Sequence, residues 1–155
     1  MPPDQRTNGD LLATLNILIG EWTMDAQFPG APPSGPIGST VFKWTLDDKF
    51  VTQRGTVHHP DVPDVFALIG LNAIGGGFTQ HYFDSRGVVR VYDMTLSENA
   101  WHLHREAADF TPLDFAQRFT GLISDDGLAI EGAWEIRHDN STWNHDFVLK
   151  YHKVS

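Results

Sequence analysis

Most of the chain alternates between hydrophobic and polar residues in short runs, which are separated by Gly, Asn, Asp and Pro. Alternation with a period of two places neighbouring side chains on opposite faces of a β-strand. About ten such runs follow one another, and this pattern predicts an all-β fold. We expect strands near 21–28, 38–46, 49–58, 65–73, 77–84, 88–96, 100–107, 115–124, 128–137 and 142–152.

One segment before the first strand has a helical period instead. A stripe of three leucines within 11–18 predicts a short helix, with Asp10 as its N-cap and Gly20 after its end. The Pro- and Gly-rich stretch 29–36 predicts a long loop. Ten antiparallel strands joined by short hairpins favour a closed up-and-down barrel, capped by the helix, in one domain spanning 1–155.

One hairpin can be assigned a register from its turn. The sequence of 84–87 is typical of a type I turn followed by a left-handed glycine, which sets Tyr82 opposite Arg90 and Gln80 opposite Tyr92. The face that carries these side chains is rich in large apolar groups, so we expect it to point into the barrel. The inward set is Phe78, Gln80, Tyr82, Arg90, Tyr92, Met94, Leu96, Trp101, Leu103 and Arg105.

Alternation predicts the inward face of the last three strands in the same way. The turn at 124–127 also allows a register that points Arg118 inward, but the apolar pattern favours the opposite face. The expected inward residues are Phe115, Gln117, Phe119, Gly121 and Ile123, then Ile130, Gly132, Trp134 and Ile136, then Trp143, His145, Phe147, Leu149 and Tyr151.

Composition narrows the classes of function. The chain has no cysteine, which excludes disulfides, thiolate metal sites and cysteine nucleophiles and fits a reducing cytoplasm. A net charge of −9 disfavours nucleic acid and anionic membranes as partners. The apolar run 11–19 is too short to span a bilayer, and the start of the chain does not resemble a secretory signal. We therefore expect a cytoplasmic monomer or homodimer.

The stretch Gly20-Glu21-Trp22, at the junction of helix and first strand, resembles the G-x-W motif of lipocalins and related calycins. The strand count is more similar to fatty-acid-binding proteins and nitrobindins than to eight-stranded lipocalins. Stretches 82–92 and 143–147 resemble an uncharacterised bacterial lipocalin-like family. The resemblance implies that Trp22 closes one barrel end beneath the helix and that the barrel holds a ligand.

Arg90, Tyr92 and Arg105 are the strongest indication of a binding site. Two arginines on an inward face are costly unless they are paired, and these strands offer no obvious inward carboxylate. An anionic ligand is therefore a natural partner. The spacing of Arg90 and Tyr92 resembles the Arg-x-Tyr pair of fatty-acid-binding proteins, which lies on the last strand rather than a middle one. Alternatively, the arginines line the barrel mouth or bind internal carbonyls and waters.

His145 is the second candidate, because an imidazole in an apolar pocket can bind haem iron, act as a base or hydrogen-bond a ligand. Nitrobindins use a late-strand histidine for haem, and the resemblance implies a comparable place for His145. The alternative is a core histidine satisfied by Gln117 or Tyr82. We expect no stoichiometric haem and no other cofactor.

His102 and His104 share a strand face with Asp93, but that face should be the outside, so we expect no metal site. The sequence favours a protein that binds a small hydrophobic or aromatic molecule with an acidic or polar head. The alternatives are a nitrobindin-like haem protein and a cofactor-free isomerase, cyclase or hydrolase, with His145 or Tyr82 as acid or base. The predicted ligand-binding residues are Gln80, Tyr82, Arg90, Tyr92, Arg105, Gln117, Phe119, Trp134 and His145.

Overall fold

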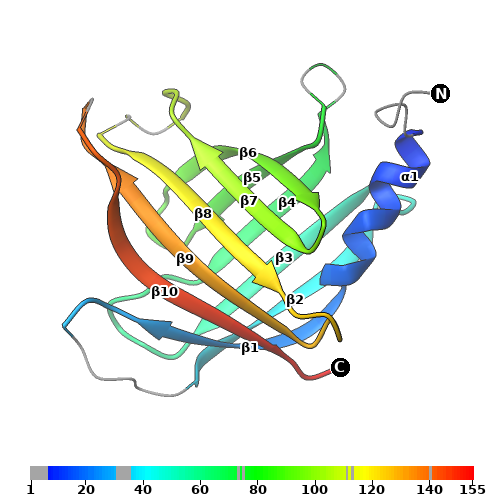
Figure 1. Ribbon diagram of the computed structural model, residues 1–155, viewed down its shortest axis with the longest axis horizontal. Coiled ribbons are helices and arrows are strands. Elements are labelled where there is room, and N and C mark those ends of the chain that lie inside the picture. The colour runs from blue at the N-terminus through cyan, green and yellow to red at the C-terminus, as the bar shows by residue number, and fades with distance from the viewer. Residues whose placement is uncertain are drawn as a thin grey trace.

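The computed structural model describes residues 7–30, 36–72, 74, 76–110, 112, 114–139 and 141–155. In this part of the chain ten antiparallel strands form a closed barrel, in which every strand pairs with its neighbours in sequence and β1 pairs with β10 (Figure 1). All ten expected strands are confirmed. They are β1 (Gly20–Gln27), β2 (Pro36–Thr45), β3 (Phe50–Val57), β4 (Val65–Leu71), β5 (Phe78–Asp84), β6 (Val89–Ser97), β7 (Ala100–Arg105), β8 (Ala116–Ile123), β9 (Ala129–Arg137) and β10 (Asn144–Lys153).

The register expected from the β5–β6 turn is confirmed. Tyr82 lies opposite Arg90 and Gln80 lies opposite Tyr92. Gly87 has a φ of 85°, which a glycine adopts without steric cost, and it lets the chain return into β6. The turn chemistry therefore determines which side chains of this hairpin face the barrel interior.

The helix begins earlier than expected. It comprises α1 (Asn8–Ala13) and a 3₁₀ segment, η1 (Thr14–Leu18). Asp10 is not the N-cap: the Thr7 hydroxyl accepts a hydrogen bond from the Asp10 amide (3.1 Å), and the Asp10 carboxylate accepts one from the Thr7 amide (3.3 Å). This reciprocal capping box makes Thr7 the N-cap, because Asp10 lies three positions into the helix.

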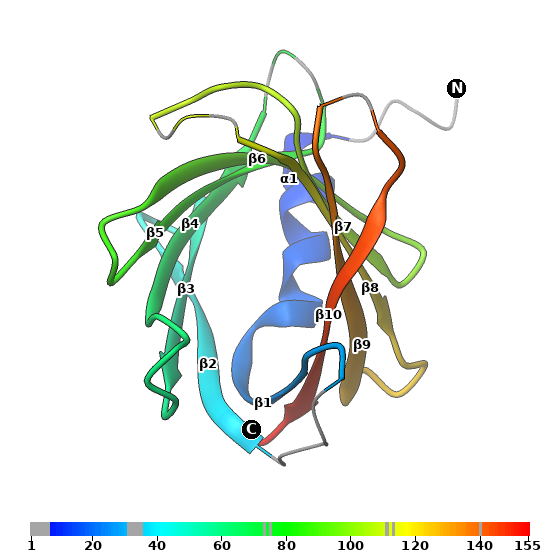
Figure 2. The same cartoon turned by 90° about the vertical axis from the view of Figure 1, so that its left-hand side faces the viewer.

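The helical segment covers one end of the barrel. In Figure 2 it is seen behind the ring of strands, at the far end. Leu15 and Leu18 are fully buried, as is Trp22 at the start of β1. The Trp22 indole donates a hydrogen bond to the Leu18 carbonyl (2.8 Å), and the Trp44 indole donates one to the Asn16 side chain (3.0 Å). These contacts fasten the helical segment to the barrel and close this end.

Glycines in β8 and β9 make room for a large side chain in the interior. A Cβ on Gly121 or Gly132 would collide with the Phe119 ring. That ring packs against Trp101 and Trp134, with centroid distances of 5.0 and 5.2 Å. The small residues thus place an aromatic cluster inside the barrel wall.

The prediction that His145 faces inward is wrong. Asp146 is an extra residue in β10, because His145 pairs with Glu135 and Phe147 pairs with Trp134. A β-bulge of this kind breaks the simple alternation of faces. His145 is consequently exposed, whereas Phe147 lines the interior.

Trp143 was also expected inside and instead lies against two arginines. The guanidinium carbons of Arg118 and Arg137 are 4.3 and 4.8 Å from its ring centroids. Arg118 also forms an ion pair with Glu135 at 2.8 Å, with its side chain 40% exposed. Arg118 therefore does not face inward, and the register expected from the apolar residues of β8 is confirmed.

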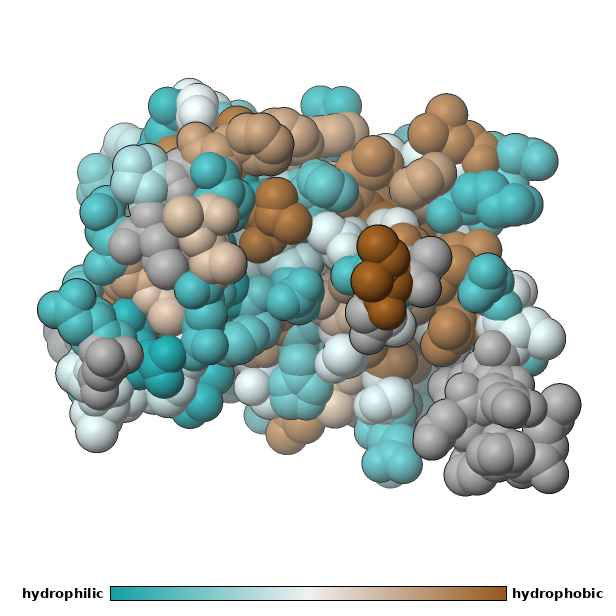
Figure 3. Space-filling view, turned by 90° about the horizontal axis from the view of Figure 1, so that it is seen from above, coloured by the Kyte–Doolittle hydropathy of each residue, from teal (hydrophilic) through white to brown (hydrophobic). Residues whose placement is uncertain are grey.

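The outer face of the barrel is mixed in polarity. In Figure 3 hydrophobic residues lie among hydrophilic ones across the surface shown. Asp93 lies opposite His104 as expected, and His104 lies 3.4 Å from Glu106. Among the described residues, no group of three or more His, Asp or Glu could hold a metal ion. No helix in this part of the chain is long and apolar enough to cross a membrane.

Candidate functional site: a cavity opposite the helix

A cavity of about 450 Å³ lies inside the barrel. Residues deep in the barrel line it, and so do Asp61, Val62, Pro63 and Arg86 from loops at the rim opposite the helix. The cavity therefore extends from the interior to this rim. Its volume is in the range of about 300–1,000 Å³ that small-molecule sites occupy.

The cavity walls are mainly apolar and aromatic. Trp134 is central, with ring centroids 5.2 Å from Phe119, 5.7 Å from Tyr92 and 6.5 Å from Phe147. Such walls suit an apolar or aromatic ligand. The apolar lining comprises Met24, Ala26, Phe28, Ile37, Val57, Val62, Pro63, Val65, Trp101, Leu103, Phe115, Phe119, Trp134, Ile136, Phe147, Leu149 and Tyr151.

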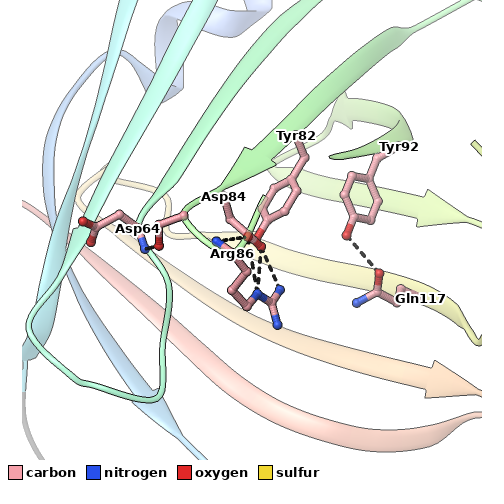
Figure 4. A network of polar contacts seen from close by, with 7 residues as sticks. Asp64, Tyr82, Asp84, Arg86, Tyr92 and Gln117 are labelled. Carbon is pink, nitrogen blue, oxygen red and sulfur yellow. Dashed lines mark hydrogen bonds and ion pairs between the residues drawn. The ribbon is translucent and has the colours of Figure 1, made fainter. Parts of the chain in front are cut away.

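Two pairs of polar side chains from different strands are hydrogen-bonded to each other on the inner face of the barrel. The Gln80 amide donates to Gln53 (3.0 Å), and the Tyr92 hydroxyl donates to Gln117 (3.0 Å; Figure 4). These bonds satisfy buried polar groups and hold them in fixed orientations. Seven of the nine predicted site residues line the cavity: Gln80, Tyr82, Arg90, Tyr92, Gln117, Phe119 and Trp134.

Tyr82 belongs to a network at the rim (Figure 4). Its hydroxyl donates to Asp84 (2.8 Å), which also accepts from Arg86 (2.7 Å). Burial raises the pKa of Tyr82 well above its usual range, and the bond to Asp84 adds to this. Burial also opposes ionisation of Asp84, but hydrogen bonds from Arg86 and Tyr82 outweigh it and lower the pKa of Asp84. Tyr82 is therefore a neutral donor that is already engaged, which does not suit a general base.

Arg105 does not line the cavity, unlike the prediction. Its guanidinium makes two bonds to Asp109, at 2.8 and 2.9 Å, and both side chains are less than a tenth exposed. Asp109 also accepts a hydrogen bond from the Val91 amide (2.8 Å). The expectation of an inward arginine without a carboxylate was wrong because Asp109 lies outside the strands, where alternation predicts nothing.

Arg90 does line the cavity, close to the rim. Its guanidinium carbon lies 5.8 Å from the Phe115 ring centroid, and its Nε is buried without a hydrogen-bond partner. Burial raises the pKa of the neighbouring Tyr92, and the positive charge of Arg90 partly offsets this. Among the described residues no carboxylate forms an ion pair with Arg90, so its charge remains available to the cavity.

His145 lies on the outer surface, and no described residue that lines the cavity is a histidine. The described lining therefore offers no imidazole that could bind haem iron or exchange a proton with a substrate. The roles expected for His145 inside the barrel, as haem ligand or as acid or base, therefore find no support in this geometry. The absence of stoichiometric haem stays a prediction.

Asp146 is a lining residue that alternation did not predict. The bulge directs it to the cavity rim, half-buried, and no hydrogen bond or ion pair reaches it from the described residues. Burial raises its pKa, and the positive field of His145 partly offsets this. A bulge inserts one residue into an otherwise regular pattern, so nothing in the strand's own sequence marks its position.

Replacing Asp146 by Asn is expected to stabilise the protein at neutral pH. Because burial raises the pKa of Asp146 in the folded state, the ionised group disfavours folding above that pKa. This penalty vanishes as the pH falls below the unfolded pKa of about 3.9. Urea denaturation at about pH 7 and about pH 3 should show a gain that is largest at the higher pH. If Asp146→Asn stabilised the protein more at about pH 3 than at about pH 7, this prediction would be contradicted.

Comparison with known proteins bears on the fold. No protein-family model matches the chain, and no curated protein sequence matches it. Among solved structures, that of Rv2717c from M. tuberculosis is similar, with a TM-score of 0.60 and 15% sequence identity. The alignment covers 94% of this chain and 98% of that chain. At this identity the likeness shows the fold alone, and it agrees with the closed antiparallel barrel described above.

Proposed function

We propose that this protein binds a small hydrophobic or aromatic molecule with an acidic head inside the barrel. One observation carries the proposal: an apolar cavity of about 450 Å³ has a cation, Arg90, in its wall with no ion-pair partner among the described residues. Aromatic walls would hold the body of the ligand. Arg90 would hold its head near the rim.

Arg90 and Arg105, the two arginines expected to bind an anion, differ in whether a carboxylate of the protein already pairs with them. Asp109 already neutralises Arg105, so an incoming anion would have to displace a bidentate partner. The buried Nε of Arg90 lacks a partner, and its desolvation has already been incurred on folding. A carboxylate near Arg90 would gain charge-assisted hydrogen bonds at a reduced desolvation cost. This supports Arg90 as the anchor.

Replacing Arg90 by Met is expected to weaken binding of an acidic probe and to spare its neutral ester. Loss of a hydrogen bond to a charged group costs roughly 1.5–3 kcal/mol, and the loss applies only to the ionised probe. Biphenyl-4-carboxylate and its methyl ester are suitable probes. Quenching of the cavity tryptophans, Trp101 and Trp134, reports binding directly, and calorimetry gives the affinity.

Arg86→Met is the matched control, because Arg86 also lies at the rim but pairs with Asp84. This variant should lower the acid's affinity much less than Arg90→Met does. If acid and ester bind alike to the wild type and to Arg90→Met, the cavity selects by shape and Arg90 is no anion site. Native mass spectrometry of gently purified protein would identify a retained ligand independently.

A further inference from the structure

One hydroxyl in the cavity wall, that of Tyr151, has no hydrogen-bond partner in the described part of the chain. Tyr151 is only 4% exposed and lines the cavity, yet no described residue hydrogen-bonds its hydroxyl. Nearly all buried hydroxyls in proteins bind a protein group or an ordered water. The Tyr151 hydroxyl is not among the fully buried atoms without a partner, so it is open to the cavity, where a water molecule or a ligand oxygen can accept its hydrogen bond.

A second unpartnered donor lies in the same part of the barrel. The Trp101 indole nitrogen is buried without a hydrogen-bond partner, and the Trp101 and Tyr151 ring centroids are 5.9 Å apart. Tyr151 pairs with Met24 of β1, two residues from Trp22 at the closed end. Both side chains therefore lie near the floor of the cavity, on the side of the helix, although the indole nitrogen itself is fully buried and only the Tyr151 hydroxyl faces the cavity.

The charges around the floor restrict what the Tyr151 hydroxyl can bind. The cations among the described lining residues are Arg86 and Arg90, and both lie near the rim. Burial raises the pKa of Tyr151 far above neutrality, so the phenol is an uncharged donor. A carboxylate at the floor would be a buried charge without a counter-charge. A neutral oxygen acceptor meets no such penalty.

We propose that the floor around Tyr151 is a subsite for a neutral oxygen of the ligand, such as a ketone, ether or hydroxyl, remote from its acidic head. This inference rests on the proposed function, because it assumes that the acid lies at Arg90. Tyr151 is five positions after Asp146 at the rim, about 16 Å along a strand. With strands tilted by about 35–45°, the axial depth is about 12 Å. The ligand class is an elongated acid that carries an oxygen at its far end.

Two biphenyl-4-carboxylates that differ at the 4′ position test this subsite. The 4′-acetyl probe presents a carbonyl oxygen to the floor, and the 4′-isopropyl probe presents a methyl group of similar size. Tyr151→Phe is expected to weaken the acetyl probe about tenfold and to leave the isopropyl probe unchanged or slightly tighter. The variant should fold at least as stably as the wild type, because the lost hydroxyl has no partner in the described part of the chain.

Tyr92→Phe is the control, since the Tyr92 hydroxyl is already bonded to Gln117. This change should affect both probes alike. An equal effect of Tyr151→Phe on both probes would overturn the floor subsite, while the proposed function would stand if Arg90→Met still separated acid from ester. If neither probe binds the wild type, both the subsite and the proposed function fall.

Discussion

Trp22→Ala is expected to lower the free energy of unfolding by about 3–5 kcal/mol, the usual range for a large core aromatic. Trp22 is a fully buried residue of β1, and its indole is hydrogen-bonded to the end of the helical segment. Its removal leaves a cavity at the closed end and the Leu18 carbonyl without its hydrogen bond (2.8 Å). Urea unfolding followed by far-ultraviolet circular dichroism measures the loss.

Trp22→Phe separates the two contributions to this loss. The phenyl ring fills most of the space but cannot donate to Leu18. We expect a smaller loss, near the 0.5–1.5 kcal/mol of an ordinary hydrogen bond plus a modest packing term, about 1–2.5 kcal/mol in total. A loss below about 1 kcal/mol for Trp22→Ala would show that this end of the barrel is held by other contacts.

Arg105→Met should also destabilise the fold by about 3–5 kcal/mol, for an electrostatic reason. The Arg105 and Asp109 side chains are 2% and 8% exposed, so removing the cation leaves a buried carboxylate without its bidentate partner. Asp109 also positions the connection after β7 through its bond to the Val91 amide. Thermal and chemical unfolding should both detect the loss, and acid-probe binding should change little in the folded fraction.

The double variant Arg105→Met/Asp109→Asn tests this cause. Neutralising residue 109 removes the negative charge that Arg105 no longer balances and keeps an oxygen acceptor for the Val91 amide. We expect the double variant to recover a large part of the stability that Arg105→Met loses. Losses that simply add would mean that the two side chains act independently.

Much of the fold follows from local sequence because turn chemistry and alternation act over a few residues. The glycine turn before β6 determines the pairing of Tyr82 with Arg90, and the apolar run of β8 determines that Phe119 faces inward. The strand count follows from the same two signals. The leucine stripe correctly predicts the helix, but the N-cap is Thr7 and not the predicted Asp10.

The predictions that were wrong concern features that do not follow the alternation of residues along a strand. Asp109 neutralises Arg105 from a connection between strands, where side-chain direction cannot be obtained from alternation. Asp146 interrupts β10, and its effect on His145 depends on how two strands pair rather than on either strand alone. Whether the Tyr151 hydroxyl has a hydrogen-bond partner likewise depends on the residues that surround it in space and not on the sequence of β10. The ion-pair partner of Arg105 and the bulge in β10 could therefore be identified only from the three-dimensional structure.

The bulge at Asp146 also affects how this chain should be aligned with other barrels. Residues before and after Asp146 follow two different alternations, so a regular last strand matches this one only if a one-residue gap is placed there. An ungapped alignment would equate His145 with an inward residue of the other barrel, although His145 is on the outside here. At 15% identity such a gap is easily missed, and functional histidines would then be transferred to the wrong face of the strand.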